Sequence, residues 1–391
     1  MARKRAFPGV SAPGARSALA VEKGGLVWVS ALYPRPTPEV SPPTDISAQM
    51  QDIFAQLDAV VRWAGASRAD VVKTVDYVIP SALPTYRATA EVRRDYFGED
   101  FPASTGIVME GLLQPEALVG VEAVLSVAPG PRRATVPADE RSRRLTFRAG
   151  VEKGGILWLS GATGRRRDPS GSEVYPPDLL EQADAIYTRH HLALEEMGYS
   201  FAQVVKTVNY LTADALPAYR HTAQVRRHYL KGPFPAATGV VVNRLLHSQA
   251  LLEVDLVAVK GKREEVNPGW DRYRELTFAP GVLAEGMLFL SGMGAIHPQR
   301  NEVVGVGNLA LQAEQCYTLV AMVVEEAGGS LEDVVKVVEY LTPSALRERE
   351  RLEEVRRQFL PDGGYALAQP VVQRLLRPEM LIEVEAVAIL D

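Results

Sequence analysis

The chain has 391 residues, of which 47% are hydrophobic and 23% charged, a composition that can bury a core, and its formal net charge is −5. No block of positive charge and no apolar run of the ~20 residues that span a bilayer occurs, so we expect neither nucleic acid nor membrane as a partner. The single cysteine, Cys316, excludes an intrachain disulfide and favours a cytoplasmic location.

The first elements along the chain are a hairpin and a helix. The hairpin is expected to turn at Lys23-Gly24-Gly25. Asp45 is a plausible N-cap for a helix in which apolar residues recur at helical spacing from 46 to 64, and Gly65 is expected to end that helix.

A strand, a second helix and two more strands follow. The strand contains Val71-Val72-Lys73-Thr74, the helix is expected at 84–97 with a proline in its first turn, and the last strand alternates over 118–127. The unit is therefore a β-β-α-β-α-β-β domain of the α/β (α+β) class, with two helices on one face of a sheet.

The same unit occurs three times. The strand at 70–77 returns at 203–210 and again at 333–340, and matched blocks precede and follow it in the same order each time. We expect three domains at 1–132, 133–265 and 266–391. The polar, proline- and glycine-bearing stretches 129–140 and 260–269 read as short linkers, so the repeats should pack on one another.

These repeated motifs resemble the reactive intermediate deaminase (Rid, YjgF-like) family. The resemblance rests on the Val-Val-Lys-Thr strand, the strand end at Trp28-Val29-Ser30-Ala31, and the motifs Phe101-Pro102-Ala103 and Phe234-Pro235-Ala236. It implies a chorismate-mutase-like fold and a pseudo-trimer around a central barrel, with ligands between repeats. The chain would then be monomeric or an assembly of intact pseudo-trimers.

The same resemblance implies hydrolysis of enamine or imine intermediates, with no cofactor. In the family an arginine just after the Phe-Pro-Ala motif would clamp the substrate carboxylate. Ser104, Ala237 and Leu367 stand at that position here, and none of them can pair with a carboxylate. The sequence therefore predicts a poor imino-acid deaminase.

The family's water-handling glutamate falls on Gly120, Glu253 and Glu383. Glu253 and Glu383 are thus the candidate catalytic residues, and Gly120→Glu is expected to be nearly silent. Strand periodicity puts Asp255 beside Glu253, and Glu385 beside Glu383, and paired acids that raise one another's pKa suit a general base. The alternative is that these acids are solvated or bond across the repeat interface.

Six further residues are candidate substrate contacts: Ser160, Ser291, Thr105, Thr238, Arg93 and Arg226. The serines end a strand where the family often lines its cleft. The arginines could supply the positive charge that the missing arginine no longer gives. The alternative for the arginines is a solvated helix face, with Glu353 pairing Arg356 or Arg357 in the third repeat.

Two residues that suggest other chemistry fit the core better. His190 aligns with the apolar stripe of the first helix, and adjacent histidines cannot easily share a metal, so no metal site is expected. Cys316 aligns with Ile53 and Ile186 on the same stripe, which predicts a buried, inert thiol.

The sequence therefore predicts a protein that binds a small carbonyl, imine or acid ligand between repeats. If it is an enzyme, it is hydrolase/deaminase-like or lyase-like and works without metal. The alternatives are a non-catalytic ligand-binding or scaffold protein, or a specialised biosynthetic enzyme on the same fold. Polar, well-formed clefts favour catalysis, whereas filled or apolar clefts favour the non-catalytic alternative.

Overall fold

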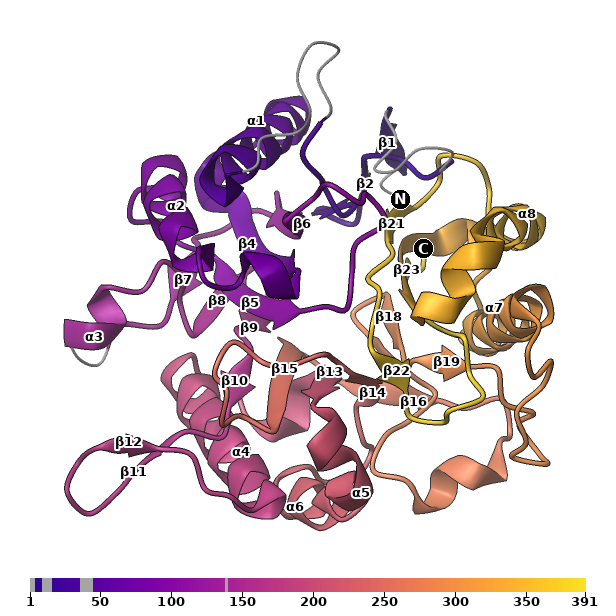
Figure 1. The fold of residues 1–391 in the computed structure, drawn as a ribbon. Coiled ribbons are helices and arrows are strands. Elements are labelled where there is room, and N and C mark those ends of the chain that lie inside the picture. Colours follow the sequence, from indigo (N-terminus) through magenta and orange to yellow (C-terminus); the bar gives the residue numbers. More distant parts are fainter. Residues whose placement is uncertain (1–3, 9–15, 36–44, 138–139) are drawn as a thin grey trace.

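The computed structural model describes residues 4–8, 16–35, 45–137 and 140–391. Figure 1 shows the three repeats as three lobes around a common centre, each with its helices on the outside. The fold is mixed α and β, with one main sheet per repeat.

Repeat 1 forms a six-stranded sheet in the order β1-β2-β3-β6-β4-β5. Its elements are β1 (Arg5–Phe7), β2 (Ala20–Lys23), β3 (Leu26–Val29), α1 (Ile46–Trp63), η1 (Arg68–Asp70), β4 (Val71–Val78), η2 (Pro80–Ala82), η3 (Tyr86–Ala88), α2 (Thr89–Phe97), β5 (Ala103–Val108) and β6 (Val119–Ser126). β4 pairs parallel with β5 and antiparallel with β6.

Repeat 2 keeps this order, and β22 of repeat 3 joins its edge strand β14. Its elements are β7 (Arg133–Ala134), α3 (Glu140–Arg143), β8 (Gly150–Lys153), β9 (Ile156–Leu159), β10 (Ala162–Thr163), β11 (Arg166–Arg167), β12 (Glu173–Val174), α4 (Leu179–Glu196), η4 (Phe201–Gln203), β13 (Val204–Leu211), η5 (Ala213–Ala215), α5 (Leu216–Tyr219), α6 (Thr222–Tyr229), β14 (Ala236–Val241) and β15 (Leu252–Val259).

Repeat 3 again forms the same sheet, in the order β16-β17-β18-β23-β20-β21. Its elements are β16 (Arg263–Val266), η6 (Asp271–Glu275), β17 (Gly281–Ala284), β18 (Met287–Leu290), β19 (Met293–Gly294), α7 (Leu309–Glu326), η7 (Leu331–Asp333), β20 (Val334–Leu341), η8 (Pro343–Glu348), α8 (Arg349–Phe359), β21 (Ala366–Ala368), β22 (Arg374–Leu375) and β23 (Ile382–Ile389).

The local signals explain these elements. Gly24 and Gly25 have φ values of 62° and 77°, as a tight turn between β2 and β3 requires. The Asp45 carboxylate accepts a hydrogen bond from the Ser47 N–H and so caps α1. The second helix begins later than expected, at Thr89, because Tyr86–Ala88 forms a 3₁₀ turn before it.

The two stretches expected to be linkers contain strands. β7 pairs with β8, and β16 pairs with β17, so each stretch adds an edge strand to the sheet of the repeat that follows it. β1 does the same for repeat 1 by pairing with β2. The edge of each first hairpin is covered in this way, which satisfies backbone groups that an exposed edge would leave unpaired.

The two faces of each sheet are buried differently. In repeat 1 the outer face packs against α1, whose Met50, Ile53 and Leu57 are fully buried. The inner faces of the three sheets meet in a central cluster in which Trp28 and Trp158 pack edge to face with ring centroids 5.6 Å apart. Burying such a side chain stabilises the fold by about 1.5–3 kcal/mol, so the centre holds the repeats together.

The three sheets face one another without joining into one continuous barrel. Adjacent repeats are linked by single bridges between residues, at Ala18 with Ala366, Ala103 with Arg148, and Ala236 with Ala279. The expected central barrel is therefore an assembly of three main sheets that do not close into one. Their junctions are held by these bridges, by the pairing of β22 with β14, and by side chains.

Candidate functional site between the repeats

The strand registers place the expected site positions at equivalent points in all three repeats. Tyr77, Tyr210 and Tyr340 of the central strands lie opposite Gly120, Glu253 and Glu383. In the parallel edge strands, Ser104, Ala237 and Leu367 are likewise equivalent, because they lie opposite Thr74, Thr207 and Val337 of the central strands. We call the junctions of repeats 1 and 2, 2 and 3, and 3 and 1 the first, second and third interface.

A serine joins the backbones at each interface. Ser160 Oγ donates to the Arg148 carbonyl at 2.6 Å and accepts from the Ser104 N–H at 2.7 Å. Ser291 makes the same two bonds, with the Ala279 carbonyl and the Ala237 N–H, and Ser30 does so at the third interface. The hydroxyls of Ser160 and Ser291 therefore already bond the backbone. Their role in substrate binding stays a prediction.

A lysine of each repeat forms an ion pair with an acid of the next. Lys73 Nζ lies 2.7 Å from Asp255, Lys206 Nζ lies 2.9 Å from Glu385, and Lys336 Nζ lies 2.5 Å from Glu122. Asp255 and Glu385, the second acids of the two expected pairs, are thus counter-ions across the interfaces, as the alternative interpretation held. These lysines and acids line a central cavity of about 100 Å³.

Thr105 and Thr238 belong to the same ion-pair networks. Thr105 Oγ1 accepts from Lys73 Nζ at 2.8 Å and donates to Asp255 at 2.7 Å. Thr238 accepts from Lys206 at 2.8 Å and donates to Glu385. Thr238 also lines the cavity at the second interface, so of the two threonines it is the one placed beside a space for ligand.

Glu253 and Glu383 are buried acids held close to a glycine of the neighbouring strand end. A Cβ at Gly161 or Gly292 would collide with the carboxylate of Glu253 or Glu383, so a larger residue at either place would force that carboxylate to move. Burial, and next the charge of Asp255, raise the pKa of Glu253 to about 8. Burial and Glu385 raise the pKa of Glu383 to about 8 as well, against the opposing influence of Lys206. Both carboxyls are therefore mostly protonated at neutral pH.

The third interface has no such acid. A Cβ at Gly120 would lie 2.5 Å from Cε1 of Tyr33, so the tyrosine ring fills the space in which the other repeats hold a glutamate. Ala31 replaces the glycine that lies against the acid elsewhere. That Gly120→Glu leaves activity nearly unchanged stays a prediction, and a longer side chain at this place would force the Tyr33 ring to move.

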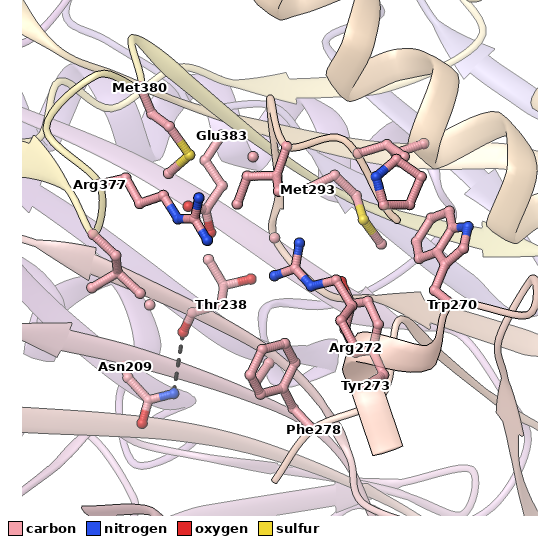
Figure 2. Close-up of a pocket in the computed structure, with 18 of the residues that line it drawn as sticks. Asn209, Thr238, Trp270, Arg272, Tyr273, Phe278, Met293, Arg377, Met380 and Glu383 are labelled. Carbon is pink, nitrogen blue, oxygen red and sulfur yellow. Dashed lines mark hydrogen bonds between the residues drawn. The ribbon is translucent and has the colours of Figure 1, made fainter. Parts of the chain in front are cut away.

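A cavity of about 180 Å³ lies at the second interface (Figure 2). Its polar lining comprises Glu383, Thr238, Asn209 and the arginines Arg226, Arg272 and Arg377, and its apolar lining includes Trp270, Tyr273, Phe278, Met293 and Met380. Figure 2 shows Arg272 and Arg377 directed into the same space as Glu383. Burial, and next the charge of Arg272, lower the pKa of Arg377. The cavity therefore offers positive charge and one protonated carboxyl to an anion.

The two arginines expected to bind substrate have different surroundings. Arg93 is 4% exposed and pairs with Asp76, which also accepts a hydrogen bond from Tyr86. Arg226 is half-buried, lines the cavity and donates to the hydroxyls of Thr277 and Thr222. The structure thus brings Arg226 together with Glu383 and Thr238, whereas Arg93 is paired internally.

His190 and Cys316 lie in the core. His190 Nε2 lies 2.9 Å from the Val254 carbonyl, and burial lowers its pKa to about 3. Cys316 is fully buried, and burial raises its pKa well above the ordinary value, so the thiol is unreactive as expected. Within the described ranges no cluster of three metal-ligating side chains occurs, and no helix there could cross a bilayer.

Several residues of the site are absent from the sequence prediction. Lys73, Lys206 and Lys336 recur at one position of three buried strands, and that recurrence of a charged residue was a signal for a buried ion pair. Asp76, Asn209 and Glu339 occupy one variable position in the same aligned block. Arg272 and Arg377 lie in loops or short turns of repeat 3, and no sequence periodicity points to them.

Comparison with known proteins agrees with this architecture. The chain is 29% identical to a RutC family protein of Synechocystis over 109 residues, which are 28% of this chain and 82% of that protein. It is 31% identical to one of Pyrococcus abyssi over 111 residues, or 28% of this chain and 84% of that protein. A crystal structure of a chorismatase aligns over 82% of this chain and 93% of its own, with a TM-score of 0.52 and 15% identity.

The family assignment follows from matches along the whole length. The sequence model described as "Endoribonuclease L-PSP" matches residues 10–127, 142–260 and 274–390, one match in each repeat. Since this family model matches each of the three repeats and the curated relatives are RutC family proteins, the chain belongs to the Endoribonuclease L-PSP family of Rid/YjgF-like proteins, as a tandem three-repeat member.

Proposed function

We propose that this protein binds a small anionic metabolite bearing a carbonyl or imine group in the cavity at the second interface, where Glu383 exchanges a proton with it. The observation that carries the proposal is a buried carboxyl, protonated at neutral pH, in one cavity with three arginines. Arginines attract and orient the anion, and the neutral carboxyl acts as a general acid in hydration, hydrolysis or a lyase-like step.

The protonation state of Glu383 removes an obstacle to binding. An ionised glutamate would repel the carboxylate of a ligand, whereas a neutral carboxyl can donate a hydrogen bond to it or to the reacting atom. With a pKa of about 8, the Glu383 carboxyl is protonated and uncharged in most molecules at pH 7. The acid can therefore sit beside an anion at neutral pH and become a base once it has given up its proton.

The contrast between the interfaces supports a working site over a scaffold role. The third interface is filled by Tyr33, and its arginine is paired with an acid. The second interface has a cavity with a polar lining of mixed charge. A filled junction suits a purely structural contact, while the polar cavity suits a ligand with a polar group to be positioned.

The test is a set of steady-state assays with the variant Glu383→Gln. The substrate panel holds imines made from 2-oxo acids, the 2-oxo acids themselves, and chorismate, after which the chorismatase neighbour is named. Turnover of a panel member should fall by roughly 10²–10⁴-fold in E383Q, because the general acid is lost. E379Q, the same change at an exposed neighbour, is the matched control. Equal rates in E383Q and wild type would refute the role of Glu383.

Glu253 remains a second candidate acid, and its interface can be compared directly. We expect E253Q to reduce turnover much less than E383Q, because Arg93, the equivalent of Arg226 in repeat 1, is paired with Asp76. A larger loss in E253Q would move the proposal to the first interface.

Low activity towards imino acids remains part of the proposal. Ser104, Ala237 and Leu367 offer no planar pair of N–H donors to a substrate carboxylate at the edge strand. With 2-aminoacrylate generated by a dehydratase, we expect little acceleration of pyruvate release. Acceleration equal to that of a family member with an arginine there would contradict this prediction.

We also propose that the pseudo-trimer closes within one chain. A single chain supplies the three lysine–carboxylate pairs that join its repeats, including Lys336 with Glu122 between the last and the first. Light scattering of the purified protein should give the mass of one chain or of an assembly of intact pseudo-trimers. A barrel to which separate chains each donate one repeat would refute this. We also expect the protein in the cytoplasmic fraction of the cell.

A further inference from the structure

One strand position differs among the three repeats beside a recurrent helix arginine. The strand residues are Asp76 on β4, Asn209 on β13 and Glu339 on β20, and the arginines are Arg93, Arg226 and Arg356. Equivalent backbone positions thus carry an acid in repeats 1 and 3 and a neutral amide in repeat 2.

Where the strand residue is an acid, it neutralises the arginine. Arg356 is 1% exposed, and its Nε and Nη2 bind the two oxygens of Glu339 at 2.9 Å each, in a two-pronged pair. Arg93 pairs with Asp76. Each arginine is satisfied inside its own repeat and has no charge left for a ligand.

Where the strand residue is an amide, the arginine is left without an acid. Asn209 donates from its side chain to the Thr238 carbonyl at 3.1 Å, the bond drawn in Figure 2. Among the described residues no carboxylate forms an ion pair with Arg226, whose partners are two neutral hydroxyls and the ring of Tyr219. This arginine lines the cavity that also holds Glu383.

We infer that the side chain at position 209 decides which interface accepts a ligand, and that the ligand presents a carboxylate to Arg226 in place of the acid side chain of the other repeats. The inference deepens the proposed function and rests on it. Asp76 and Glu339 are then internal counterparts of the ligand's carboxylate. Asn209 keeps the space beside Arg226 free of negative charge until the ligand arrives.

Physical chemistry favours a carboxylate over other anions at this point. A half-buried guanidinium needs a counter-ion, and the planar fork of arginine matches a planar carboxylate in two-pronged geometry. Glu339 shows that the equivalent helix–strand pair of repeat 3 accommodates such a pairing. In repeat 2 the carboxylate would take the place of the Thr277 hydroxyl on Nε of Arg226. A cavity of about 180 Å³ has room for a small organic acid.

The experiment measures binding of four carboxylate probes by isothermal titration: acetate, pyruvate, benzoate and succinate, with benzamide as an uncharged comparison. The wild type should bind at least one carboxylate probe, and R226Q should lose that binding. N209D should weaken it by roughly 10–100-fold, since the new acid pairs with Arg226 and competes with the ligand. N209A removes the same amide without adding charge and should lose less than N209D.

R227Q, at the exposed neighbour of Arg226, is the matched control and should bind as the wild type does. If the wild type binds none of the carboxylate probes, or if R226Q binds as well as wild type, the proposed function fails and the inference with it. If R226Q loses binding while N209D keeps it, the inference alone is overturned. If N209A and N209D lose the same amount of carboxylate binding, the inference is also overturned, because binding would then depend on the amide group of Asn209 and not on the absence of a charge at that position.

Discussion

The wild-type protein should lose stability as the pH rises from 4.5 to 8, and replacing Glu253 and Glu383 with glutamine should remove that loss. Both carboxyls have their pKa raised from 4.5 to about 8 in the folded chain, mainly by burial. Folding therefore favours the protonated form. The stability that this protonation contributes is fully present below pH 4.5 and is lost as the pH rises through about 8.

The structure sets the size of the effect. Each side chain is 5% exposed, so solvent screens it little. A pKa raised from 4.5 to about 8 corresponds, at about 1.36 kcal/mol per pH unit, to about 5 kcal/mol of unfolding free energy per carboxyl as an upper limit. Glutamine has nearly the shape of the protonated acid and does not titrate, so the double variant should show a flatter profile.

Urea unfolding across that pH window, followed by circular dichroism, is the assay. The stability of the double variant relative to wild type should rise with pH by a few kcal/mol, and each single variant should show part of the rise. E379Q, at an exposed position, should follow the wild type at every pH. Parallel profiles for the wild type and the double variant would refute the burial argument, and the assignment of Glu383 as a neutral acid would fall with it.

Three further experiments, two on variants and one on the unchanged protein, test other features. Gly120→Ala should destabilise the fold by about 1–3 kcal/mol in a melting experiment, because the new methyl group meets Tyr33; an unchanged melting temperature would show that the ring can move aside. Asp76→Asn should cost about 3–5 kcal/mol in urea unfolding by leaving the buried charge of Arg93 unpaired, and a neutral result would mean that the pair is not formed in solution. Cys316 should react with a thiol reagent only when the chain unfolds, so rapid labelling of the native protein would contradict its burial.

Most of the fold could be predicted from the sequence because its signals are local and repeated. The helix cap at Asp45, the glycine turn at 24–25 and the alternating last strand each follow from short-range rules, and each occurs in its expected place. The additional edge strands β7 and β16 were missed because they are short and their pairing depends on a partner strand more than on their own pattern.

The site could be predicted only in part, because it depends on contacts between repeats. The family resemblance put Glu253 and Glu383 in equivalent places, and the registers confirm that equivalence. Periodicity could not show that Asp255 would meet Lys73 of another repeat. Nor could it distinguish Arg226 from Arg93, because the difference lies in a residue of a separate strand that only the fold brings to the arginine.

Joining the repeats in one chain has a consequence for how the interfaces can differ. In a trimer of identical subunits every substitution is made at all the interfaces together, so an acid that forms an ion pair with the arginine of one interface does so at the others too. Here the junctions carry different residues: a glutamate with a paired arginine, a glutamate with an arginine lacking an acid partner, and a tyrosine in place of the acid. Two junctions are thereby free to serve as rigid supports for the remaining one, and a single chain is expected to bind one ligand where a symmetric trimer would bind three.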